Sequence, residues 1–140
     1  MLRRSRLACI ALAFAPLACG AATYTVGGVG ADYPTLNALF AGEDLNGGDI
    51  VEVTGGIIYS GDIVMPAADG GAPGNPVILR GVGPSRPHLR GGTNTIEFRL
   101  SDHVVMEYFE VSGTTMPVNT FRCVCDHAHD IVLRDVYIHD

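Results

Sequence analysis

The sequence contains no lysine and no tryptophan, and charged residues make up only 17% of its 140 positions. Without lysine, no lysine base can lie within these 140 residues. Only four cysteines are present, and Cys9 and Cys19 lie in or beside an N-terminal apolar segment, which excludes a disulfide scaffold. That segment, Leu7 to Ala18, is too short to span a membrane.

What is abundant is glycine, with 18 residues, and apolar side chains, which make up 47% of the chain. High apolar content with few charges argues against disorder. Many glycines and few helix formers indicate an all-β chain rich in turns. A chain of 140 residues is long enough for one domain at most.

The N-terminus has the pattern of a signal peptide. Arg3, Arg4 and Arg6 precede the apolar run, and small residues follow it. We expect residues 1–22 to be removed by cleavage near Ala22, which leaves residues 23–140 as the folded part. A lipoprotein signal cut before Cys19, with a lipid anchor there, is the alternative, and Pro16 disfavours it. Either way the protein is expected to be secreted or periplasmic.

The net charge is acidic, −6 for the whole chain. Without the three leader arginines, six arginines remain against fifteen acidic residues, a net charge of −9. Such a surface repels nucleic acid and anionic membranes, so neither is an expected partner. Calcium, which carboxylates favour, would still allow an anionic polymer to bind. We expect a monomer.

One segment occurs twice. Residues 102–113 return as residues 129–140, shifted by 27, and Val104 superposes on Ile131 as Met106 does on Leu133. The shift also places Glu107 beside Arg134, although charge did not guide the alignment. A repeat of this length, built from short alternating strands, predicts a stacked β-solenoid.

A second pair of strands is expected at residues 95–100 and 120–125. Aligning Ile96 with Phe121 and Phe98 with Cys123 gives an offset of 25 and sets Glu97 beside Arg122. In this interpretation a longer turn at residues 126–129 supplies the two residues that convert 25 to 27. Each opposite pair would contribute about 0.2–1 kcal/mol.

The N-terminal part adds a helix and more strands. Residues 32–40 predict a short helix with Asp32 or Tyr33 at its cap and Pro34 in its first turn, covering the open end of the solenoid. Strands are expected at residues 49–53, 57–59, 62–65 and 76–80. Since the last strand reaches Asp140 with no capping element, we expect further coils to follow.

The order of these elements resembles the N-terminal region of secreted right-handed parallel β-helix proteins of the pectate-lyase-like superfamily. The segments that carry the resemblance are residues 31–39, 48–53, 56–59, 74–81 and 136–140. The resemblance implies a right-handed parallel β-helix with a short N-terminal capping helix, and an acidic polysaccharide as partner. It also implies that the main catalytic coils lie beyond Asp140 and that these residues alone are inactive.

The function expected first is a lyase that cleaves a uronate polysaccharide by β-elimination, which needs a base and a cation. Outward candidates are His103, His129, His139, Arg134, Glu110, Asp135 and Asp140. We select His139 and Asp140, with Arg134, as catalytic residues. The alternatives are a non-catalytic carbohydrate-binding or adhesin-like solenoid and a pectinesterase-like hydrolase, which needs paired aspartates.

Two metal interpretations compete with simpler ones. Cys123, Cys125 and His127 alternate on one face and would suit zinc, but inward thiols that pack as small hydrophobes explain them better. Calcium would suit the turn aspartates, although turn residues of this kind usually bond their own backbone. These aspartates are Asp102, Asp126, Asp130 and Asp135.

Overall fold

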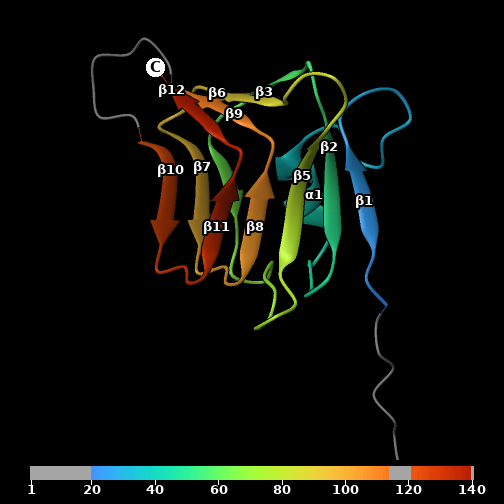
Figure 1. Ribbon diagram of the computed structural model, residues 1–140, viewed down its shortest axis with the longest axis vertical. Coiled ribbons are helices and arrows are strands. Elements are labelled where there is room, and N and C mark those ends of the chain that lie inside the picture. Colours follow the sequence, from blue (N-terminus) through green and yellow to red (C-terminus); the bar gives the residue numbers. More distant parts are fainter. Residues whose placement is uncertain (1–19, 114–120, 140) are drawn as a thin grey trace, which may run out of the picture.

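The computed structural model describes residues 20–113 and 121–139. Twelve described strands and one helix wind into a parallel β-helix of about four coils, and the strands of successive coils form three parallel sheets (Figure 1). The all-β parallel β-helix with its capping helix is thereby confirmed. Among the described residues, no helix is long and apolar enough to cross a membrane, because α1 (Leu36–Gly42) has only seven residues.

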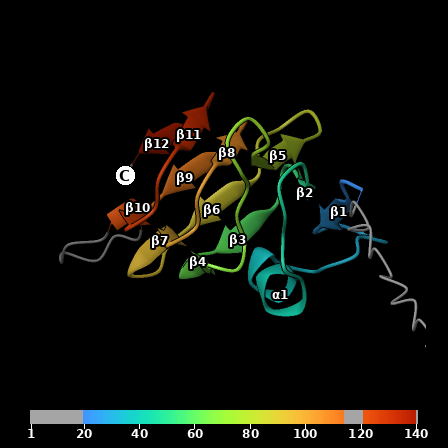
Figure 2. The same cartoon turned by 90° about the horizontal axis from the view of Figure 1, so that it is seen from below.

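Each sheet collects equivalent strands from successive coils. Sheet A has the order β1 (Thr23–Val26), β2 (Ile50–Thr54), β5 (Val77–Val82), β8 (Val104–Glu107) and β11 (Ile131–Arg134). Sheet B consists of β3 (Ile58–Ser60), β6 (His88–Arg90), β9 (Glu110–Ser112) and β12 (Tyr137–His139). Sheet C consists of β4 (Ile63–Met65), β7 (Asn94–Arg99) and β10 (Phe121–Asp126). Figure 2 shows the strands of successive coils following one another across the molecule, from β1 toward β11 and β12.

The core forms because inward residues of one coil lie directly on those of the next. Val51, Leu79 and Met106 are paired in register across β2, β5 and β8, and all three are fully buried. Leu133 continues this column but is 41% exposed, since it lies in the last described coil. Parallel strands stack at about 4.8 Å, so each column excludes water between coils.

The predicted 27-residue repeat is confirmed at the pairs chosen for it. Ile131 pairs with Val104, and Leu133 pairs with Met106. Arg134 pairs with Glu107, and the Nη1–Oε2 distance is 3.1 Å. The left-handed turn residues repeat as well, because His103 and Asp130 both have φ near +54° (53° and 54°).

The offset of 25 predicted for β7 and β10 is wrong. Cys123 pairs with Ile96, not Phe98, so this sheet also keeps an offset of 27. Glu97 consequently pairs with Val124 instead of Arg122, and its carboxylate accepts a hydrogen bond from Nε of Arg99 at 2.7 Å. A slip of two residues leaves the same side chains facing inward, so alternation alone cannot detect it.

Helix α1 (Leu36–Gly42) packs against β4 at the first coil, and it buries Leu36, Leu39 and Phe40 as expected (Figure 2). Its N-cap is Thr35, whose Oγ1 accepts a hydrogen bond from the Ala38 N–H at 3.1 Å. The predicted cap at Asp32 or Tyr33 is wrong. Asp32 instead accepts hydrogen bonds from the backbone and hydroxyl of Thr25, which holds the preceding loop to β1.

Candidate functional site

The outward face of sheet B gathers the chemically active side chains. In β6, β9 and β12 the central residue faces the core, so the first and third residues face outward. His88 pairs with Glu110, and Glu110 pairs with Tyr137 in the next coil. His139 lies two residues after Tyr137, on the same face. We call His88, Glu110 and His139 the sheet B triad.

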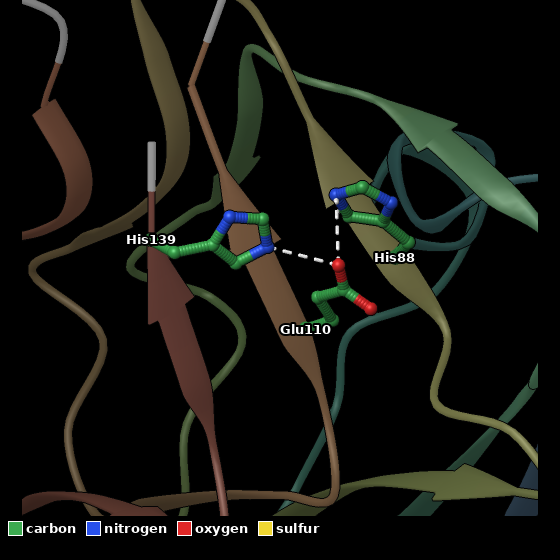
Figure 3. Close-up of side chains that lie close together, drawn as sticks. All are labelled: His88, Glu110 and His139. Carbon is green, nitrogen blue, oxygen red and sulfur yellow. Dashed lines mark hydrogen bonds and ion pairs between the residues drawn. The ribbon is translucent and has the colours of Figure 1, made fainter.

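Both imidazoles of the triad point toward one carboxylate oxygen (Figure 3). Nε2 of His139 lies 2.9 Å from Oε1 of Glu110, which is hydrogen-bond distance. Nε2 of His88 lies 3.7 Å from the same oxygen, and 2.7 Å from the hydroxyl oxygen of Ser112. The three side chains are 20–32% exposed, so they remain accessible to solvent.

Aromatic contacts continue the site. The ring of Tyr137 stacks on that of His139 with centroids 4.6 Å apart, and Tyr137 is 58% exposed. The rings of His88 and His139 lie 6.0 Å apart. A flat, exposed aromatic face beside charged groups is suited to contact with a ligand that has both apolar and polar edges.

An open pocket of about 450 Å³ lies beside the triad, and His88 and Glu110 form part of its wall. Arg86 and Tyr108 also line the pocket, with the guanidinium 4.7 Å above the tyrosine ring. Asp135 holds Arg86 through an Nη2–Oδ1 contact of 2.7 Å. This hydrogen bond, more than any other contact, raises the pKa of Arg86, so the pocket keeps a permanent cation.

The structure places two of the three selected catalytic residues on different sheets. His139 lies on sheet B, whereas Arg134 lies on β11 of sheet A, where it contacts Glu107. Glu107 also accepts from Nε of Arg80 at 2.7 Å, so it bridges arginines of two other coils. Asp140 lies outside the described residues.

The remaining outward candidates serve turns. Nδ1 of His103 lies 3.2 Å from Oδ2 of Asp130. The backbone N–H of His129 donates to Asp102 at 2.8 Å. Asp135 holds Arg86 as described above, and only Glu110 of this group joins His139 in one site.

The proposed zinc ligands do not gather in the part of the chain that the structure describes. Cys123 and Cys125 are free thiols, and Cys125 is exposed. Burial, with a smaller contribution from Cys125, raises the pKa of Cys123 to about 12. Nδ1 of His127 lies 2.7 Å from Oδ1 of Asp126. The aspartates considered for calcium are divided among separate contacts with His129, His127, His103 and Arg86.

Sequence reasoning missed His88, although it named Glu110 as a candidate and selected His139. His88 precedes Glu110 by 22 residues and therefore lies off the 27-residue repeat. The available signal was the segment Pro87 to Gly92, in which a single apolar residue, Leu89, sits between polar neighbours and before a glycine turn. That pattern is typical of a short strand with one inward side chain.

Comparison with solved structures supports the fold. The chain is similar to the GH136 lacto-N-biosidase from Eubacterium ramulus, with a TM-score of 0.60 and 15% sequence identity. The match covers 85% of this chain and 27% of that one, so the chain spans about a quarter of the enzyme's length. No protein-family description matches the chain, and no curated protein matches it. The similarity establishes the parallel β-helix architecture.

Proposed function

We propose that this chain belongs to a carbohydrate-active β-helix protein that binds an acidic polysaccharide along the outward face of sheet B and cleaves it by β-elimination. The observation that carries the proposal is the contact between His139 and Glu110 beside an open pocket. The similar solved structure is a carbohydrate-active enzyme by its name, which supports the broader part of the proposal. The resemblance to pectate-lyase-like proteins supports the finer part.

His139 is the proposed base. A neutral imidazole carries one N–H and one lone pair, and donation from Nε2 to the Glu110 carboxylate leaves the lone pair on Nδ1. Nδ1 would take the proton from the carbon next to the uronate carboxylate. The electrons of that C–H bond form the C4–C5 double bond, and the glycosidic oxygen leaves C4 with the electrons of the C–O bond and takes a proton from water. Glu110 orients the ring without touching the substrate.

Arg90 is the proposed cation that neutralises the uronate carboxylate. It is exposed on β6, and its register partner Ser112 pairs in turn with His139. Arg90 and His139 therefore lie in one column, two strand spacings of about 4.8 Å apart, and a bound sugar can span this distance between the two side chains. Among the described residues, no ion pair involves Arg90, so its charge is available to a ligand.

The non-catalytic alternative has one observation in its favour. The exposed stack of Tyr137 on His139 would bind a sugar ring with no chemistry. The esterase alternative has less support, because no two aspartates pair across neighbouring strands within the described registers.

We also propose export and a monomeric state, since the basic and apolar leader and the acidic remainder suit an extracytoplasmic protein. Calcium as a bridge to the polysaccharide stays a proposal.

The test follows ultraviolet absorbance from unsaturated sugars with polygalacturonate or alginate, using the protein in its full natural length. The expected result is a rise that His139→Ala reduces about a hundredfold or more. His127→Ala is the matched control, because His127 is an exposed histidine outside sheet B. Binding without any rise would replace the lyase with the carbohydrate-binding alternative. If the protein shows no binding and no rise in absorbance with any uronan, the whole proposal is overturned.

A further inference from the structure

The geometry points to a second role for the sheet B triad, as a site for a divalent transition metal such as zinc. Among the described residues, His88, Glu110 and His139 form the one group whose potential ligand atoms all lie within 4.8 Å of one another (Figure 3). Metal binding needs no carbohydrate, so this inference goes beyond the proposed function and can be tested without it.

The ligand set selects the class of metal. Two imidazoles and one carboxylate suit zinc, cobalt, nickel or copper, whereas calcium and magnesium prefer oxygen ligands alone. Among the described residues, Glu110 is the one carboxylate of the group. Zinc sites with two histidines and one glutamate hold the metal with three protein ligands and leave a fourth position open for water or substrate.

The distances are close to those that a bound ion requires. Metal–ligand bonds of about 2.0–2.1 Å place the ligand atoms of a tetrahedral site about 3.3 Å apart. The two histidine–glutamate distances, 2.9 and 3.7 Å, lie on either side of that value. The distance between the ligand nitrogen atoms of His88 and His139 reaches the same value through small side-chain rotations, which partly exposed imidazoles can make.

The strands position the three ligands. The three residues project from β6, β9 and β12, which are held in register by the parallel sheet. The almost fully buried Ser112 contacts Nε2 of His88 through its hydroxyl and would release this nitrogen to a bound ion. Ligands on strands are positioned more accurately than ligands on loops. Exposure of 20–32% leaves an entry path for the ion.

Metal and base chemistry exclude each other at His139. A metal on Nε2 moves the imidazole proton to Nδ1, and this removes the lone pair that proton abstraction requires. The metal-bound and proton-accepting forms are therefore alternative states of one site. Metal binding is also expected to weaken as the pH falls, since protons compete for the same nitrogen atoms.

The test titrates tag-free protein, stripped with chelator, with Co²⁺ and with Zn²⁺. The expected result is one equivalent bound, visible ligand-field absorption from Co²⁺, and no thiolate charge-transfer band. His88→Asn and Glu110→Gln should each weaken binding about tenfold or more. His127→Ala and Cys125→Ser are the matched controls and should bind like the unchanged protein. Circular dichroism verifies that all four variants keep the fold.

Three outcomes would overturn the inference. The first is no binding at up to millimolar metal, and the second is equal affinity in the His88 and Glu110 variants. The third is calcium binding as tightly as zinc with the same losses, which would exclude a transition-metal site. A protein that binds zinc but no uronan would reject the proposed function and keep the metal site, so the two failures are distinguishable.

Discussion

Nε2 of His139 lies 2.9 Å from Oε1 of Glu110, although 29 residues separate the two in the chain. The contact crosses from one coil to the next and joins residues that are not register partners, because Glu110 pairs with Tyr137. It sets the direction of the imidazole and thus defines which ring nitrogen faces the carboxylate. The first prediction depends on this orientation.

Glu110→Gln is expected to lower turnover on uronan about tenfold to a hundredfold, because the imidazole of His139 is then no longer held in the orientation that proton abstraction needs. Glu110 is a positioning residue, so the loss should fall on kcat and leave KM little changed. Glu52→Gln is the matched control, since Glu52 is an outward glutamate on neighbouring sheet A. Equal losses in both variants would contradict the assigned role.

Gly27→Ala is expected to destabilise the fold. Gly27 has φ of +75°, and an added Cβ would lie 2.0 Å from the Tyr59 hydroxyl oxygen. That hydroxyl is held by donation to the Thr54 carbonyl oxygen at 2.9 Å, so it cannot withdraw without cost. The left-handed backbone costs about 1–2 kcal/mol. Overpacking adds about 1–3 kcal/mol.

The control for Gly27 is Gly30→Ala, measured by urea unfolding of both variants. Gly30 has a similar φ of +81° but open space around it. Its substitution should carry only the backbone cost of about 1–2 kcal/mol. If the two variants lose the same free energy of unfolding, contact with Tyr59 contributes nothing.

Asp69 makes stability depend on pH. Its side chain is fully buried, Oδ1 accepts from the Leu45 N–H at 2.8 Å, and Oδ2 has no partner within the described structure. Burial raises the pKa of Asp69 to about 6. The folded state therefore binds the proton more tightly than the unfolded chain does, in which the pKa of an aspartate is about 3.9.

Its contribution to stability is complete below pH of about 4 and is lost as the pH rises through about 6. Asp69→Asn cannot titrate and should remove this slope. The free energy of unfolding of the natural chain should fall by up to about 3 kcal/mol relative to the variant across that window. Urea unfolding at several pH values measures it, and parallel curves would show that Asp69 does not titrate on unfolding.

Cys123 should react slowly with iodoacetamide. Burial raises the pKa of its thiol to about 12, which lowers the fraction of reactive thiolate. We expect labelling at least about tenfold slower than at exposed Cys125. Peptide mass spectrometry separates the two positions, and denatured protein, where both should label alike, is the control. Faster labelling of Cys123 would mean that β10 opens readily.

The repeat of 27 residues and the inward apolar pattern determined the architecture. Met106 and Leu133 superpose because equivalent coils must bury equivalent side chains. The sequence shows this requirement directly, because apolar residues recur at the spacing of the repeat. The Glu107–Arg134 contact follows from the same register. Local signals also located helix α1, although Thr35 and not Asp32 caps it, since Thr25 binds the Asp32 carboxylate.

Only the tertiary structure decided the register of β10 and the composition of the site. A two-residue slip preserves which side chains face inward, so the sequence could not separate offsets of 25 and 27 for Cys123. His88 meets Glu110 at a separation of 22 residues, whereas Ile58 meets His88 at 30. Turns of different length vary these separations while the strands stay stacked. The fold follows from what repeats, and the site is completed by His88, which lies off the 27-residue repeat that contains Glu110 and His139.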